Sequence, residues 1–169
     1  MTPAPDRRAS PPPIDVLVES PLWNKEPAAE KTIRTAITEA AATLGKPAGE
    51  IAIVLTDDTT IQALNRDWRG IDKATNVLSF PAHTPNPQAA AAMLGDIVIA
   101  YETLSRECSD EGKNFLHHLS HLTVHGFLHL MGYDHENDSN AETMEKLEGS
   151  ILARLDVPDP YLARDTGNA

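Results

Sequence analysis

The chain has 169 residues, of which 14 are lysine or arginine and 25 are aspartate or glutamate, so its formal net charge is −11. Hydrophobic residues make up 41% of it and charged residues 23%, which excludes collagen-like, coiled-coil and wholly disordered proteins. No run of about 18 apolar residues exists, so we expect no membrane span. The single cysteine, Cys108, excludes an internal disulfide framework and favours a reducing, cytoplasmic location.

The first half of the chain predicts a sheet with helices between its strands. Residues 1–13 are rich in proline and alanine, lack the apolar core of a signal peptide, and predict a flexible tail. Runs of β-branched and aliphatic residues predict strands at 14–19, 50–56, 75–80 and 95–100. Apolar residues at helical spacing predict a helix over 27–44 and another from the capping residues 57–59 through Trp68.

The second half predicts helices alone. They cover 102–108, 113–131 and 139–155, and the middle one is strongly apolar and rich in histidine. Residues 158–169 predict a frayed tail, which leaves a single domain over 14–157. Because the strands come early and most helices late, we expect an α+β fold, with a small mixed four-stranded sheet and about five helices packed on it.

Six of the seven histidines fall between His117 and His135. Each helical residue advances about 100°, so His125 and His129 lie one turn apart on one face of the central helix. Gly132 can adopt the left-handed conformation that ends a helix, and the following turn can then bring His135 back to the same point. Three imidazole nitrogens with an open fourth position are typical of a catalytic zinc ion. The spacing therefore predicts one Zn²⁺ on these three histidines.

The other histidines have simpler interpretations. A pair at this spacing is more often packed side chains than a metal site, and it is the third histidine after a glycine that favours a metal. His121 with His125 is a competing pair, although no third ligand follows it at a turn. We expect His118 and His121 to support the ligands or line a pocket, and His117 and His83 to be solvated.

The same spacing occurs in zinc peptidases with the pattern H-E-x-x-H-x-x-G-x-x-H. Gly126 stands where those enzymes carry the glutamate that acts as general base. A metallopeptidase is therefore disfavoured, and another reaction must use the water that the metal activates.

The segment HGFLHLMGYDH, residues 125–135, resembles the signature of the YbeY family of bacterial rRNA-maturation endoribonucleases. The resemblance extends to LNRDWRGIDKATNVLSFP at 64–81 and LGDIVIA at 94–100, and with the flanking elements it covers most of 14–155. It implies an α+β fold, zinc on the three histidines, and single-strand-specific RNA cleavage. The expected role is ribosomal RNA processing, including maturation of the small-subunit 3′ end, and ribosome quality control.

The resemblance also assigns one catalytic residue. The arginine that the family places in its cleft corresponds to Arg69, whose guanidinium matches the geometry of a phosphate, although a lone arginine is more often a solvated surface residue. The family usually has an aspartate where this chain has Asn76, so a carboxylate role does not carry over, whereas a structural hydrogen bond can survive.

Further residues have candidate roles near such a site. Trp68 and Tyr133 are candidates for stacking on unpaired bases, and Phe80 is expected to pack in the core. Asp96 is a candidate acceptor for a ligating histidine, with a strand-end cap as the simpler interpretation.

The expected partners are single-stranded and ribosomal RNA, together with a ribosomal protein or an assembly GTPase. Residues 61–100 carry three positive and three negative side chains, so the acidity lies elsewhere and limits RNA contact without excluding it. Two alternatives remain open: a zinc hydrolase acting on peptides or small phosphoesters, and a ribosome-assembly factor in which zinc is structural.

Overall fold

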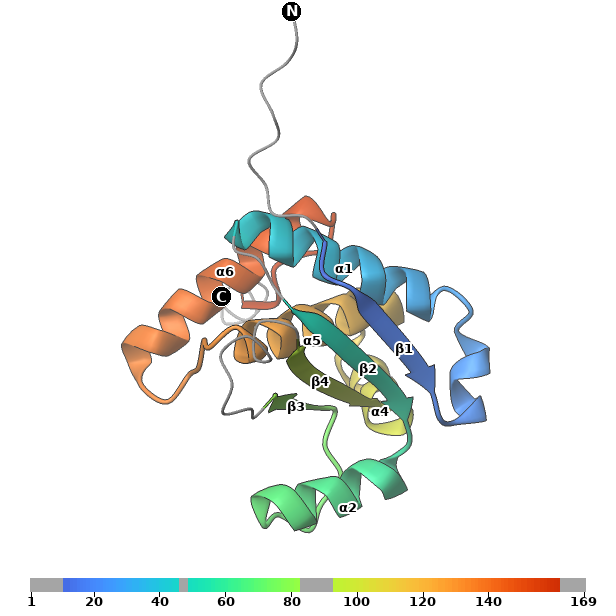
Figure 1. The fold of residues 1–169 in the computed structure, drawn as a ribbon. Helices are drawn as coiled ribbons and strands as arrows, with labels where there is room; N and C mark the ends of the chain where they lie inside the picture. Colours follow the sequence, from blue (N-terminus) through green and yellow to red (C-terminus); the bar gives the residue numbers. More distant parts are fainter. Residues whose placement is uncertain (1–10, 46–48, 83–92, 162–169) are drawn as a thin grey trace, which may run out of the picture.

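The computed structural model describes residues 11–45, 49–82 and 93–161. The expectations for His83 and for residues 1–10 and 162–169 lie outside this part of the chain. Its elements, labelled as in Figure 1, are β1 (Ile14–Val18), η1 (Pro21–Lys25), α1 (Ala29–Leu44), β2 (Glu50–Thr56), α2 (Asp58–Arg69), β3 (Val77–Pro81), β4 (Met93–Ala100), α4 (Tyr101–Glu111), α5 (Phe115–Leu130) and α6 (Asp138–Arg154).

The four strands form one mixed sheet in the order β1-β2-β4-β3. The first three are parallel, and β3 runs antiparallel to β4 at the edge of the sheet. Five α-helices surround this sheet in the described residues, which confirms the predicted α+β architecture.

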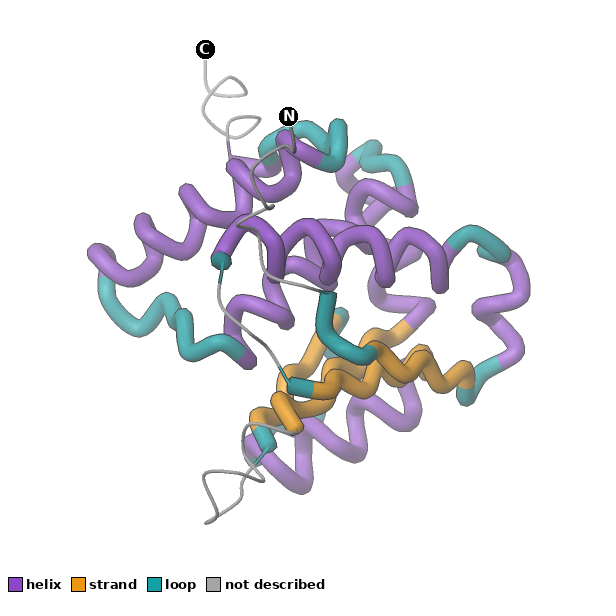
Figure 2. Tube along the Cα trace, turned by 45° about the horizontal axis from the view of Figure 1, so that its top comes forward, coloured by secondary structure: helices purple, strands orange, loops and turns teal. Residues whose placement is uncertain are grey.

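The two faces of the sheet are covered unequally. Ile97 and Ile99 of β4 belong to the main core, which α1, α4, α5 and α6 complete. Val98 and Ala100 point to the other face, where they pack with Ile61 of α2. In Figure 2 the strands form a layer with one helix beneath it and the other helices above. The alternation along β4 therefore divides the core between one face that packs against several helices and another where α2 is the helix among the described elements.

The apolar composition of α5 follows from its central position. It packs against α1, α4, α6 and the strands β3 and β4, and Leu119, Val124, Phe127 and Leu128 are fully buried. A helix that is apolar on most sides is expected where other elements surround it. Among the helices of the described ranges, none combines the length and hydropathy that crossing a bilayer would require.

The observed boundaries differ from the predicted ones by up to three residues, and one element was missed. The 3-10 helix η1 begins where the Ser20 hydroxyl accepts a hydrogen bond from the Leu22 amide. The predicted helix over 102–108 extends to Glu111, because Gly112 in the left-handed conformation is what ends it. Strand β3 begins at Val77, whose amide donates a hydrogen bond to the side-chain oxygen of Asn76.

Candidate active site

Three histidines meet at the C-terminal end of α5. His125 and His129 lie one turn apart on this helix, and their ring centroids are 4.6 Å apart. Gly132, with φ of +99°, has the predicted left-handed conformation in the turn that follows. The turn brings the His135 ring to 5.8 Å from that of His125 and 5.1 Å from that of His129. One ligand nitrogen from each histidine lies within 4.8 Å of the other two, so the structure brings the predicted ligands together.

Hydrogen bonds determine which nitrogens face this centre. His129 Nδ1 donates to the Tyr133 carbonyl at 3.0 Å, and His125 Nδ1 donates to Glu148 Oε1 at 2.6 Å, because both oxygens can only accept. In the neutral rings the Nε2 atoms then carry lone pairs, and these atoms face each other at 3.1 Å. Two lone pairs at this distance repel unless a cation lies between them. Nitrogens on one tetrahedral zinc ion lie about 3.3 Å apart, so the donor set fits a metal.

Glu148, on α6, is the buried carboxylate behind the ligands. Its side chain is 0% exposed and accepts hydrogen bonds from His125 Nδ1, from His121 Nε2 at 3.0 Å and from the Tyr161 hydroxyl at 2.6 Å. Burial alone would raise the pKa of Glu148, but the hydrogen bonds and the adjacent His125 outweigh it and lower the pKa to about 2. The group therefore stays ionised and keeps His125 oriented with Nε2 toward the centre.

The role of Glu148 was not predicted from the sequence, where Asp96 was a candidate acceptor for a ligating histidine. That candidate is wrong for His125 and His129, whose Nδ1 atoms bond to Glu148 and to the Tyr133 carbonyl. Asp96 is exposed on β4, where it pairs with Phe80 across the strands. The sequence did contain a sign of a buried carboxylate on α6. Glu148 lies at helical spacing from the apolar Met144 and Ile151, so it falls on the buried face of the helix, where an acidic residue needs a partner.

The competing histidine pair also has a third partner. His121, His125 and Glu148 bring one ligand atom each within 4.8 Å of the others, and the third member comes from α6 rather than from a turn. In this arrangement Glu148 is already bonded to both histidines, so His121 supports the carboxylate that orients His125.

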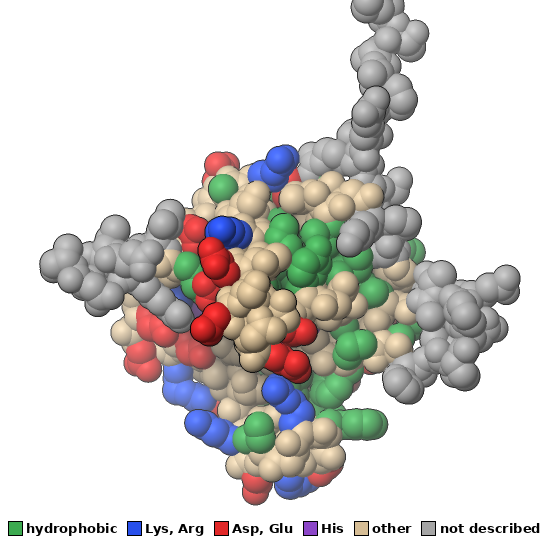
Figure 3. All heavy atoms as spheres, turned by 90° about the vertical axis from the view of Figure 1, so that its left-hand side faces the viewer, with side chains coloured by type: hydrophobic (Ala, Val, Ile, Leu, Met, Phe, Trp, Pro, Cys, Tyr) green, Lys and Arg blue, Asp and Glu red, His purple; other side chains and the backbone are tan. Residues whose placement is uncertain are grey.

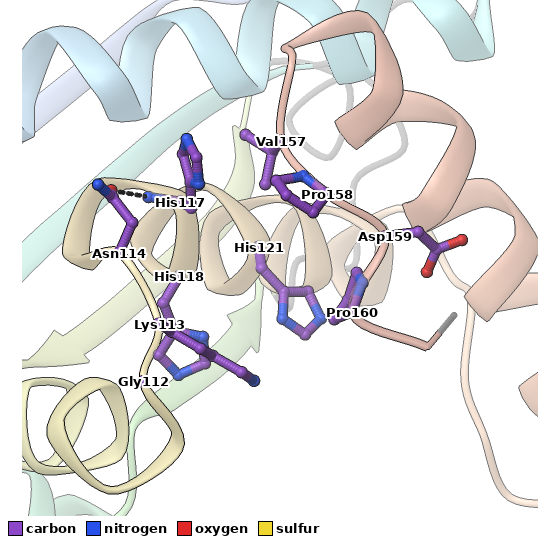
Figure 4. A pocket seen from close by; sticks show the side chains of 10 residues that line it. All are labelled: Gly112, Lys113, Asn114, His117, His118, His121, Val157, Pro158, Asp159 and Pro160. Carbon is purple, nitrogen blue, oxygen red and sulfur yellow. Dashed lines mark hydrogen bonds between the residues drawn. The ribbon is translucent and has the colours of Figure 1, made fainter. Parts of the chain in front are cut away.

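A pocket of about 270 Å³, whose lining does not include the three candidate ligands, lies beside α5 (Figure 4). As predicted, His118 and His121 line it, next to residues 157–160 that follow α6. His117 also contributes to the lining and is exposed to solvent, as predicted. Burial lowers the pKa of His118 and outweighs the opposing effect of Glu107, whose carboxylate lies 2.8 Å from His118 Nε2.

Asn76 connects to this histidine through Glu107. Its amide nitrogen donates to both Glu107 oxygens, at 3.0 and 3.2 Å, and its amide oxygen accepts from the Val77 amide at 2.7 Å. An aspartate at this position would instead face a second carboxylate. The structural hydrogen bond expected at position 76 is present, because the Val77 amide donates to the side-chain oxygen as it could to an aspartate. The donation to Glu107 is additional, and only the amide of Asn76 can make it.

A cavity of about 620 Å³ lies in front of the three histidines. Arg69, the last residue of α2, lines it together with them. The rest of the lining comes from the turn 132–136, from Thr75 and Asn76, and from every residue of the edge strand β3 except Phe80. Within the described ranges no ion pair or hydrogen bond engages the Arg69 guanidinium. The arginine predicted from the family pattern thus shares one cavity with the predicted ligands.

Gly126 lies where α5 packs tightly against β3 and β4. A Cβ atom on this residue would lie 3.0 Å from Ile97 Cγ2 and 3.1 Å from Ser79 Oγ, which donates a hydrogen bond to the Gly126 carbonyl. Any side chain at this position, including the glutamate of the zinc peptidases, would require Ile97 or Ser79 to shift. The tight packing here is consistent with the glycine that this chain carries in place of that general base.

The fold and the site define a class of α+β protein, with a three-histidine candidate metal centre in a cavity that also holds an arginine. The chain belongs to the YbeY family: the family model described as Endoribonuclease YbeY matches residues 19–156. A relative of that name from Rhodopseudomonas palustris (strain BisB18) is 55% identical over 166 residues, covering 95% of this chain and 99% of the relative.

A relative of the same name from Nitrobacter winogradskyi is 56% identical over 160 residues, covering 91% of this chain and 84% of the relative. A solution structure of a Thermotoga maritima protein matches 85% of this chain and 91% of its own, with 21% identity and a TM-score of 0.49.

Proposed function

We propose that this protein is a metal-dependent endoribonuclease that cleaves single-stranded RNA in the cavity between the three histidines and Arg69. The observation that carries the proposal is that both kinds of group line the same cavity. Relatives that are 55% and 56% identical over almost the whole chain are named endoribonucleases.

In this proposal His125, His129 and His135 hold the metal, and zinc is the preferred ion because all three donors are imidazole nitrogens. When bound, zinc supplies Lewis acidity and a nucleophile at neutral pH. Arg69 holds the oxygens of the scissile phosphate with its planar guanidinium and offsets the charge that develops on them. Glu148 fixes the ring orientation of His125 through its bond to Nδ1.

The physiological substrate in this proposal is ribosomal RNA, including the precursor 3′ end of the small subunit, in the cytoplasm. The resemblance of 125–135 and 64–81 to the family signature supports this substrate. The net charge of −11 opposes broad binding to a phosphate backbone, so a ribosomal protein or an assembly GTPase is the expected aid to recruitment.

The test combines metal analysis with cleavage of an RNA that carries a duplex and a single-stranded tail. We expect one zinc ion per chain and cuts confined to the tail. His125→Ala is expected to lose both metal and cleavage. His117→Ala, an exposed histidine on the same helix, should keep both. Full zinc content in His125→Ala would refute the ligand set.

Two further measurements, peptide hydrolysis and co-sedimentation with ribosomal particles, separate the alternatives. Hydrolysis of peptides in place of RNA, abolished by a chelator, would assign another zinc hydrolase. Co-sedimentation of metal-free His125→Ala with ribosomal particles, with no RNA cleavage by the zinc-loaded wild type, would assign an assembly factor.

A further inference from the structure

Trp68 is the most exposed large hydrophobic side chain in the described part of the chain, at 71%. The other tryptophan, Trp23, is 3% exposed, and its ring contacts Tyr101 and Phe115 in the core. A solvent-facing indole is a large apolar area left unburied by folding, and such surfaces mark contacts with other molecules when further features surround them.

The first such feature is the support beneath the indole. Its ring lies 6.1 Å from that of Phe80 in an edge-on contact, with 64° between the planes. Phe80 in turn packs partly buried against Ile61, Leu78 and Val98 on the α2 face of the sheet. The core packing predicted for Phe80 is thus confirmed, and it gives Trp68 a fixed base while most of its surface stays open.

The second feature is the position of Trp68 beside the cavity. It precedes Arg69 in the last turn of α2, and Phe80 lies between Ser79 and Pro81 on β3, both of which line the cavity. Because β3 is the edge strand, no further strand of the described sheet separates the indole from the cavity entrance. A ligand that crosses this edge can touch Arg69 and Trp68 together.

The third feature is charge. Arg69 and Lys73 lie near the indole in the sequence, whereas the nearby Arg66 is paired with Asp67 at 3.0 Å. Figure 3 shows lysine and arginine side chains gathered over the lower part of the face, where α2 lies, with apolar side chains among them. Most acidic side chains on this face lie above them. An anionic ligand with flat apolar groups matches this combination.

We propose that Trp68, supported by Phe80, is a platform on which an unpaired base of the RNA stacks while a neighbouring phosphate lies against Arg69. This inference rests on the proposed endoribonuclease function. Every base has a flat face, so such a contact tolerates any sequence. The bases of a duplex are covered by their neighbours, so the platform favours single strands over duplexes.

The two tryptophans make the proposal measurable in the full-length, zinc-loaded protein. The probe is a short unstructured oligonucleotide with 2′-O-methyl sugars, checked on a gel to remain uncut. We expect saturable quenching of the Trp68 emission by this probe and none by the matching duplex. Trp23 is too buried to report the contact directly, so Trp68→Phe should lose the quenching.

Matched variants test the affinity. Trp68→Ala is expected to weaken binding of the probe about tenfold, and Trp68→Phe to weaken it less, because base–aromatic stacking accounts for affinity of this size. In cleavage of RNA, Trp68→Ala should raise KM more than it lowers kcat. Leu17→Ala is the control, since it removes an exposed apolar side chain on β1, at the opposite edge of the sheet.

The outcomes distinguish the stacking platform from the proposed endoribonuclease function on which it rests. Cleavage by the wild type with unchanged probe affinity in Trp68→Ala would overturn the platform alone. Absence of both binding and cleavage in the wild type would overturn the proposed function and the platform with it. Self-association that Trp68→Ala abolishes, with RNA affinity unchanged, would assign the indole to a protein contact and also overturn the platform.

Discussion

The Glu148 carboxylate accepts a 2.6 Å hydrogen bond from His125 Nδ1, although the two residues are 23 positions apart and lie on different helices. The bond sets the His125 ring with its other nitrogen 3.1 Å from His129 Nε2. His121 and Tyr161 donate to the same buried carboxylate. If the His125 ring rotated, the ionised Glu148 carboxylate would lose one of its three hydrogen-bond donors, which is costly for a buried charge. The candidate metal centre is therefore oriented from behind by α6.

Glu148→Gln is expected to weaken zinc binding about 10- to 100-fold, because the amide replaces an anion that orients a ligand. A competition titration against a chromophoric zinc chelator measures the change. Glu145→Gln is the control, since Glu145 is exposed on the same helix. Equal affinities for Glu148→Gln and the wild type would show that the carboxylate has no such effect.

Zinc is expected to raise the Tm of the chelator-treated protein. An ion bound there would relieve the repulsion between the two facing Nε2 lone pairs. A ligand that binds the folded state alone stabilises it by mass action, by about 2.7 kcal/mol at 100 times Kd. Differential scanning calorimetry measures the shift. His125→Ala should show no shift with zinc and His117→Ala should show the full one. A full shift in His125→Ala would place the ion elsewhere.

Arg69→Glu is expected to abolish RNA cleavage with the zinc content unchanged, because it places a carboxylate where a phosphate is to be held. Single-turnover cleavage and elemental analysis measure the two quantities. Arg66→Glu makes the same charge change one turn earlier on α2, outside the cavity lining, and should retain most of the cleavage. Equal activity of Arg69→Glu and the wild type would remove Arg69 from the mechanism.

In Gly126→Ala the new methyl group overpacks the contact with the fully buried Ile97, which costs about 1–3 kcal/mol. The higher helix propensity of alanine returns about 1 kcal/mol, so the expected net destabilisation is up to about 2 kcal/mol. Urea denaturation measures the change. A variant as stable as the wild type would show that Ile97 and Ser79 can yield at this crossing.

His118 is expected to make stability depend on pH. Burial lowers its pKa below the ordinary 6.5, so the unfolded chain takes up the proton more readily. The stability is therefore fully present above pH 6.5 and declines as the pH falls from there toward the folded pKa.

Urea denaturation of chelator-treated protein between about pH 7.5 and 5.5 tests this slope. In His118→Gln the unfolding free energy should fall less over this range than in the wild type. The unfolding free energy of His117→Gln, a change at an exposed position, should fall as much as that of the wild type. Identical slopes for His118→Gln and the wild type would contradict the prediction.

Local spacing was sufficient to predict most elements and the meeting of the three histidines. The rotation per residue places His125 and His129 on one face, and the turn chemistry of Gly132 accounts for His135. Glu148 and Tyr161 could not be found in this way, because they reach the site only through packing of α6 and the following segment on α5. Periodicity gives the buried face of a helix but not its neighbour, so a buried carboxylate has no predictable partner until the helices are paired.

The hydrogen bond between Tyr161 and Glu148 bears on the biosynthesis of the site, because residues are translated in sequence order. All three candidate metal ligands are translated before Glu148, and Glu148 is translated before the tyrosine hydroxyl that completes its set of donors. A nascent chain therefore contains the ligands before it contains the groups that hold them in place. The site reaches its final geometry only after the segment that follows α6 has been made and has packed on α5.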